Sequence, residues 1–266
     1  MFGFKRRKRR RIREAPFPAD WLAILKRRVA YYHRLTPGDQ AELRGHIQVF
    51  LAEKEFGGCA GLEITDDIRV TVAAMACILL LHRETNYFPL MHSVLVYPRH
   101  YFVPTVQELE GGIVAEETLD YEGESWRRGP VVLSWADVLK DAADPDDGYN
   151  VVLHEFAHQL DSESGAEDGA PPIPDRSMAS DWARVLGEAY RELIDDIEEG
   201  RPHFIDAYGT TSPAEFFAVV TELFFEAPAE LKHYHPELYD RFKHYYRQDP
   251  VTRLPAGGAP GDEMSE

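Results

Sequence analysis

The sequence has few cysteines and no long apolar run. Its 266 residues include only two cysteines, Cys59 and Cys77, which excludes a disulfide-stapled secreted fold and a cysteine-based zinc finger. The longest apolar run, residues 72–81, is half of the roughly 20 residues that a membrane-spanning helix needs. The basic N-terminus is followed directly by residues 13–16 (REAP), not by the apolar stretch of a secretory signal. We therefore expect a cytoplasmic protein without membrane spans.

Basic side chains are scarce outside one short segment. The chain has 29 Lys and Arg against 46 Asp and Glu, and eight of the basic residues lie in residues 5–13 (KRRKRRRIR), which hold no acid. The rest of the chain then carries 21 basic against 46 acidic side chains, a net charge of −25. Because phosphates repel such a body, we expect no direct nucleic-acid binding by it. The basic segment is either a contact for anionic surfaces or a solvated arm on the acidic body.

Length and composition predict one domain between two tails. At about 150 residues per domain, the length allows one large domain or two small ones, and 44% hydrophobic residues are enough for a core. We predict a disordered basic tail over 1–15 and a single domain over 16–250. Its helical part covers about 16–85 and its catalytic part about 86–250. Residues 251–266, rich in Pro, Gly and acids, are predicted to be a second disordered tail.

Local patterns predict an α+β fold whose second half is mainly helical. Cap residues and 3.6-residue periodicity predict helices over 36–53, 66–81, from 150 onward, 177–199, 212–225 and from 236 to before 250. Segments rich in Val, Tyr and Leu between Gly and Pro predict strands over 92–97, 112–115 and 130–133. These segments form at most a small sheet beside the helices.

The helix that starts near residue 150 carries an HExxH motif. His154 and His158, four residues apart, lie on one helix face, so both imidazoles can reach one zinc ion. Glu155 lies to one side, where a general base can contact a water on the metal. The alternative is an internally hydrogen-bonded polar cluster on a buried helix. A third histidine, as in HExxHxxGxxH, is excluded because Asp161 and Ser164 stand where that motif needs Gly and His.

A carboxylate further along the chain must then complete the site, and three remain possible. Glu215 and Glu222, seven residues apart on one helix face, are the first two, and Asp206 is the third. Spacing favours Glu215 only slightly, because Ser212 and Glu215 also form a capping box, in which the carboxylate would only bond a backbone N–H. Asp161 is either a carboxylate that orients a metal-bound imidazole or a surface group at the helix end.

Three segments resemble one known family. HEFAHQLD (154–161), IDAYGTTSPAEFFAVVTELFF (205–225) and YRQDP (246–250) are similar to Mlc titration factor A, a family of bacterial cytoplasmic zinc metallopeptidases. The resemblance runs from about residue 21 to 250, and its C-terminal half is also similar to the catalytic domain of anthrax lethal factor. It implies a helix-rich, zincin-like metallopeptidase domain with a small sheet and an HExxH helix. Both terminal tails lie outside the resemblance.

The resemblance also implies site residues and a function. Zinc, one per chain, would be bound by His154, His158 and Glu215, with Glu155 as the general base and the Tyr208 phenol as a donor to the developing oxyanion. The family implies aminopeptidase-like cleavage of peptides and binding of the glucose repressor Mlc, which relieves repression of the sugar phosphotransferase system. The alternative is a regulatory protein that sequesters a transcription factor, with the metal site secondary.

Overall fold

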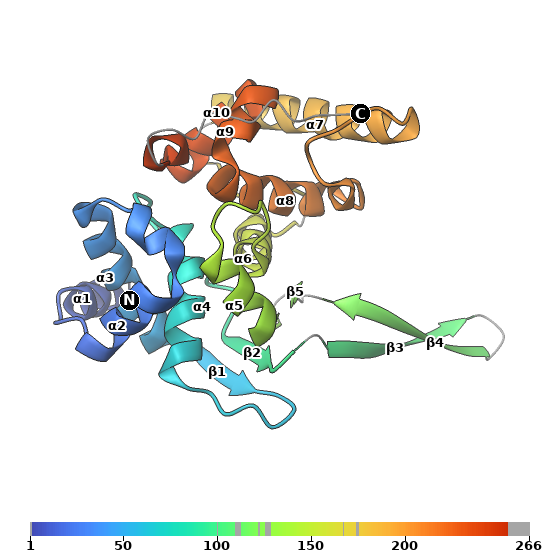
Figure 1. Cartoon of the computed structure of the whole chain (residues 1–266). Helices are drawn as coiled ribbons and strands as arrows, with labels where there is room; N and C mark the ends of the chain where they lie inside the picture. The colour runs from blue at the N-terminus through green and yellow to red at the C-terminus, as the bar shows by residue number, and fades with distance from the viewer. Residues whose placement is uncertain are drawn as a thin grey trace.

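The sheet is small and mixed, and the helices lie above it and to one side (Figure 1). The computed structural model describes residues 2–99, 101–109, 113–121, 123–125, 129–166, 168–173 and 176–254. In Figure 1 the sheet lies below the central helix, the N-terminal helices lie on the left and the C-terminal helices above. This arrangement confirms the predicted helix-rich α+β class.

The four-stranded sheet has the order β1-β2-β6-β5. Its strands are β1 (Glu55–Gly58), β2 (Ser93–Tyr97), β6 (Val131–Ser134) and β5 (Gly123–Ser125). The first three are parallel, and β5 runs antiparallel at the edge. A separate antiparallel ribbon, β3 (Tyr101–Leu109) with β4 (Ile113–Tyr121), projects from the body (Figure 1). The strands predicted over 92–97, 112–115 and 130–133 correspond to β2, β4 and β6, except that Gly112 lies outside the described residues.

Helices fill the segment before and around β1. They are α1 (Phe2–Arg13), α2 (Ala19–Arg28), the 3-10 helix η1 (Ala30–Arg34), α3 (Pro37–Glu53) and α4 (Asp66–Ile78). As predicted, Thr36 caps α3, where its hydroxyl accepts a hydrogen bond from the backbone N–H of Asp39. The next helix, α4, ends at Ile78, three residues before the predicted end, although the following residues 79–81 are also buried.

The predicted disordered basic tail is wrong for residues 2–13, which form α1. The Arg9 guanidinium donates two hydrogen bonds, of 2.8 and 2.7 Å, to the carboxylate of Glu53 on α3. Ile12 packs against the core, and the Gln48 amide donates to the carbonyl of Ala15. Composition alone predicted a disordered tail, because it cannot show contacts with partners that lie 33 to 44 residues away in the sequence.

The second half is mainly helical. Its helices are α5 (Trp135–Ala143), α6 (Val151–Asp161), η2 (Ser162–Ser164), α7 (Arg176–Glu198), η3 (Ala207–Thr210), α8 (Pro213–Glu226), α9 (Pro228–Tyr234), α10 (Pro236–Tyr246) and η4 (Pro250–Arg253). Four of them, α6, α7, α8 and α10, start within one residue of the predicted starts, whereas α5 and α9 were not predicted. The last helix, η4, enters the segment predicted as a C-terminal tail, and residues 255–266 of that segment lie outside the described residues.

The central helix α6 joins the two sets of helices into one core. Its Phe156 packs against Phe50 of α3 and against Phe88, with ring centroids 5.7 and 4.8 Å apart. On the other side, α6 packs against α8. Strand β1, from the predicted helical part, pairs with β2, from the predicted catalytic part, so the two parts share one sheet. Within the described ranges, no helix is both long and apolar enough to cross a membrane.

Candidate metal centre

Helix α6 is held at its N-terminus by side chains of its own segment and of α8. The Asn150 side chain accepts a hydrogen bond from the N–H of Leu153 at 3.0 Å, which caps the helix. The Asn150 backbone N–H donates to Glu222 Oε2 of α8 at 2.6 Å. The other side chains of α6 are buried. His154 and His158 are half-buried, and they face α8.

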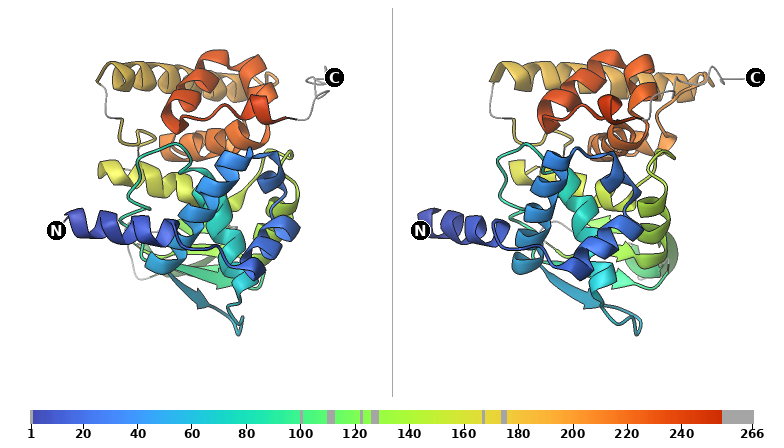
Figure 2. Two further views of the ribbon diagram at one scale, coloured as in Figure 1. Left: turned by 90° about the vertical axis from the view of Figure 1, so that its left-hand side faces the viewer. Right: turned by 60° about the vertical axis from the view of Figure 1, so that its left-hand side comes forward.

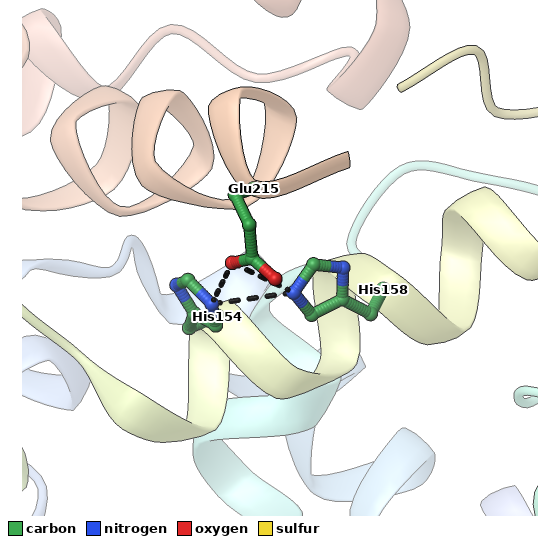
Figure 3. Close-up of side chains that lie close together, drawn as sticks. All are labelled: His154, His158 and Glu215. Atoms are coloured by element: carbon green, nitrogen blue, oxygen red, sulfur yellow. Dashed lines mark hydrogen bonds and ion pairs between the residues drawn. The ribbon is translucent and has the colours of Figure 1, made fainter. Parts of the chain in front are cut away.

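Three side chains from α6 and α8 converge on one point (Figure 3). His154 Nε2 lies 3.0 Å and His158 Nε2 3.4 Å from Glu215 Oε2, and the two Nε2 atoms are 3.2 Å apart. One ligand atom from each residue lies within 4.8 Å of the other two. This group, which could hold a metal ion, contains the HExxH histidines and one of the three carboxylates that the sequence left open.

The cap of α8 leaves the Glu215 carboxylate for this group. Ser212 caps α8, and its hydroxyl accepts from the backbone N–H of Glu215 at 3.2 Å. Only the Glu215 amide takes part in that bond, so the carboxylate is available to the two histidines. Ser212 therefore positions the first turn of α8 from which Glu215 reaches α6.

Glu222 has a different role from the one the sequence suggested. Its Oε1 accepts a hydrogen bond from His154 Nδ1 at 2.7 Å, and Glu222 is only 6% exposed. A proton fixed on Nδ1 leaves the Nε2 lone pair directed at the converging group, which is how carboxylates orient metal-binding histidines. The seven-residue spacing from Glu215 was the only sequence signal for this contact, since it places both carboxylates on one face of α8.

The electrostatics of the site favour a positive charge at its centre. Burial alone would lower the pKa of His154, but Glu222 and Glu215 raise it well above its ordinary value. Burial would raise the pKa of Glu215, yet the hydrogen bonds from His154 and His158 hold it far below the usual range. Two carboxylates thus stabilise a cation between them, and a divalent metal would take the place of the histidine proton.

The donor atoms fit a metal of the zinc class. Two imidazole nitrogens and one carboxylate oxygen are a common ligand set of catalytic zinc, in which three protein ligands leave a position for water. Hard cations such as Mg²⁺ and Ca²⁺ prefer oxygen ligands alone. The chemistry of the three donors therefore matches the metal that the sequence motif predicts.

The remaining predicted residues lie around this group. Glu155 is 3% exposed on α6, next to His154. The Tyr208 side chain is 54% exposed, and its ring centroid lies 6.1 Å from that of His154. Asp206 is not part of the converging group: its Oδ1 accepts from the Tyr208 N–H and its Oδ2 from the Tyr149 hydroxyl, both at 2.8 Å. Asp206 therefore holds two tyrosines at the rim, and Tyr149 had no motif that marked it in the sequence.

A loop after α6 supports the N-terminus of α8. Asp161 Oδ2 accepts from the Gly169 N–H at 2.9 Å, and the Gly169 carbonyl accepts from Trp182 Nε1 at 3.0 Å. Gly169 has a φ of +73°, and a Cβ there would lie 2.4 Å from the Pro213 carbonyl oxygen. Only glycine allows this approach, so the loop packs directly on the first residue of α8. Asp161 therefore holds the loop against α8, and it is neither a surface group nor bonded to a histidine by this oxygen.

Comparison with known proteins gives one family over most of the chain. The family model described as glucose-regulated metallo-peptidase M90 matches residues 4–247, so the match includes most of α1, which the sequence resemblance did not cover. An uncharacterized protein of Synechocystis is 40% identical over 239 residues, which are 90% of this chain and 87% of that protein. Mlc titration factor A of Klebsiella pneumoniae is 37% identical over 227 residues, 84% of each chain. Mlc titration factor A of Salmonella agona is 36% identical over 235 residues, 87% of this chain and 88% of that protein.

Proposed function

We propose that this chain, which belongs to the glucose-regulated metallo-peptidase M90 family, is a zinc-dependent peptidase of aminopeptidase type. The observation that carries the proposal is the convergence of His154, His158 and Glu215, which come from two helices that pack against each other. Zinc bound there would act as a Lewis acid toward a water and a scissile carbonyl. The side chains around the group then account for the proton transfers.

Glu155 and Tyr208 have distinct proposed roles. Glu155 accepts the proton of the attacking water and passes it to the leaving amine, a task that suits a buried carboxylate beside the first histidine. The Tyr208 hydroxyl donates to the oxyanion that forms on the substrate carbonyl. The ring of Tyr208 lies close to that of His154 and is exposed, so it can meet a substrate from the open side.

A regulatory role in the cytoplasm is the second part of the proposal. Several relatives carry the name Mlc titration factor A, and their identity to this chain extends over most of both proteins. By this similarity, a repressor of the Mlc type is the proposed protein partner, and its binding would act on sugar phosphotransferase control. The same names favour the alternative function, in which repressor binding is primary and the metal centre secondary.

Three single-residue variants test the metal site and separate these functions. Elemental analysis of purified protein should give one zinc per chain, and His154→Ala or His158→Ala should abolish it. Glu155→Gln should retain zinc and repressor binding but lose peptide hydrolysis, because the substitution removes only the proton acceptor and leaves the three proposed ligands in place. Hydrolysis at wild-type rate by Glu155→Gln would refute the peptidase mechanism. Full zinc content in both histidine variants would refute the metal site.

A further inference from the structure

Helix α1 takes no part in the metal centre, yet it carries the strongest concentration of positive charge in the chain. We propose that its outward face docks the protein on an anionic lipid surface. The helix holds eight basic side chains and no acidic one, whereas residues 14–266 carry a net charge of −25. The proposal concerns a surface beyond the peptidase site, and its test does not depend on catalysis.

Contacts with α3 fix which face of α1 is turned outward. The Arg9 side chain is 12% exposed, and its guanidinium bonds Glu53 and the Asn86 carbonyl. Ile12 packs against the core, three residues further along the helix. Arg13, four residues after Arg9, lies over Gly45, where an added Cβ would be 3.4 Å from the Arg13 side chain. These positions follow the i, i+3, i+4 spacing of one helix face, so the opposite face is turned away from the body.

The outward face combines an aromatic side chain with cations. Phe4, Arg7 and Arg11 follow the i, i+3, i+7 spacing and lie opposite Arg9, and all three are exposed. Phe4 is 79% exposed, more than any other large hydrophobic side chain whose exposure the structure describes. The neighbouring Lys8 is exposed as well. Figure 2 shows α1 extending from the body with the N-terminus at its far end, where this face can reach a flat surface.

This combination fits a bilayer better than a nucleic acid. Helices that lie in a membrane interface insert aromatic side chains below the headgroups, while Lys and Arg on the same segment contact anionic lipid. Nucleic-acid phosphates would meet the cations equally well but would leave Phe4 in water, and the acidic body would repel them. At a membrane, the same repulsion keeps the body away while only the extended helix makes contact.

The expected strength follows from the number of cations. Each Lys or Arg near an anionic leaflet changes the membrane partition coefficient by about fivefold, and the attraction weakens as salt shortens the Debye length. Reversal of two outward arginines, in Arg7→Glu with Arg11→Glu, should therefore lower partitioning by more than about 100-fold. Phe4→Ala should lower it by about tenfold through lost apolar burial, without any change of charge.

Co-sedimentation of the full chain with vesicles tests the proposal. One set of vesicles is phosphatidylcholine alone, and the other contains about one third phosphatidylserine. The matched control is Lys26→Glu with Arg191→Glu, which makes the same charge change at two exposed positions outside α1. Wild-type and control proteins should bind the anionic vesicles only, and added salt should release both. The outward variants should lose binding while their unfolding temperature stays unchanged, because the Arg9 anchor to Glu53 is intact.

Three results would overturn the proposal. Equal binding to neutral and anionic vesicles would show that charge is not the attraction. An equal loss in the control would show that net charge, not α1, governs binding. Tight binding of a DNA duplex that ignores Phe4→Ala, together with no vesicle binding, would assign the helix to nucleic acid instead. A salt titration of vesicle binding by the wild-type chain tests the role of charge without any variant.

Discussion

Glu222→Gln should weaken zinc binding without removing a ligand. Glu222 Oε1 accepts from His154 Nδ1 at 2.7 Å, and its Oε2 accepts from the Asn150 N–H at 2.6 Å. Glutamine has the same shape but only one acceptor oxygen and no charge. One of the two donors must then face the amide NH₂ group. His154 loses the carboxylate that fixes its proton on Nδ1, or the N-terminus of α6 loses a buried hydrogen bond.

The magnitude follows from the charge of the lost bond. A hydrogen bond to a charged group contributes about 1.5–3 kcal/mol, and carboxylates that orient metal-bound histidines change metal affinity by about 10–100-fold. The two estimates agree, because 10–100-fold corresponds to about 1.4–2.8 kcal/mol. Glu215→Gln replaces a proposed ligand directly, so its loss of affinity should be larger. The histidine pair itself stays in place in both variants.

Competition between demetallated protein and a fluorescent zinc chelator measures this affinity. Glu226→Gln is the matched control: it makes the same change on α8, but Glu226 bonds the Asn150 side chain and has no bond to a histidine among the contacts described for it. Its zinc affinity should stay within about threefold of wild type. Wild-type affinity in Glu222→Gln would refute the orienting role of Glu222. A loss equal to that of Glu215→Gln would show instead that Glu222 is a ligand.

Three further predictions follow from the same contacts. Tyr208→Phe should retain zinc and KM but lower kcat by about 10²–10³, the usual effect of an oxyanion donor; an unchanged kcat would remove it from the mechanism. Gly169→Ala should cost more than about 1 kcal/mol in urea unfolding, because φ is +73° and the Pro213 carbonyl is 2.4 Å from the new Cβ. Burial raises the pKa of Glu226 to about 10, so folding keeps a proton that the unfolded chain releases above pH 4–5, and stability falls as pH rises toward 10. Glu226→Gln should remove that decline and add on the order of 3 kcal/mol at pH 7; unchanged pH dependence of unfolding would contradict this.

Local interactions explain what could be predicted from the sequence. The starts of α3, α6 and α8 were predicted because Thr36, Asn150 and Ser212 each bond a backbone N–H three residues ahead. The pairing of His154 with His158 needed only the four-residue spacing of one helix face. Strands β1, β3 and β5 were not predicted. Strands β1 and β5 are short, and β1 contains two glycines, so neighbouring strands rather than propensity determine them.

Contacts between distant segments were decided only by the tertiary structure. Glu215 and Glu222 lie on one face of α8, and the sequence could not tell which of them reaches the two histidines. Their bonds to His154 span 61 and 68 residues, and they depend on how α6 packs against α8. The same holds for the basic segment, because α1 is joined to α3 by the bond from Arg9 to Glu53, 44 residues away. Caps and helix spacing are encoded within a few residues, but the approach of two helices is set by the packing of the whole core.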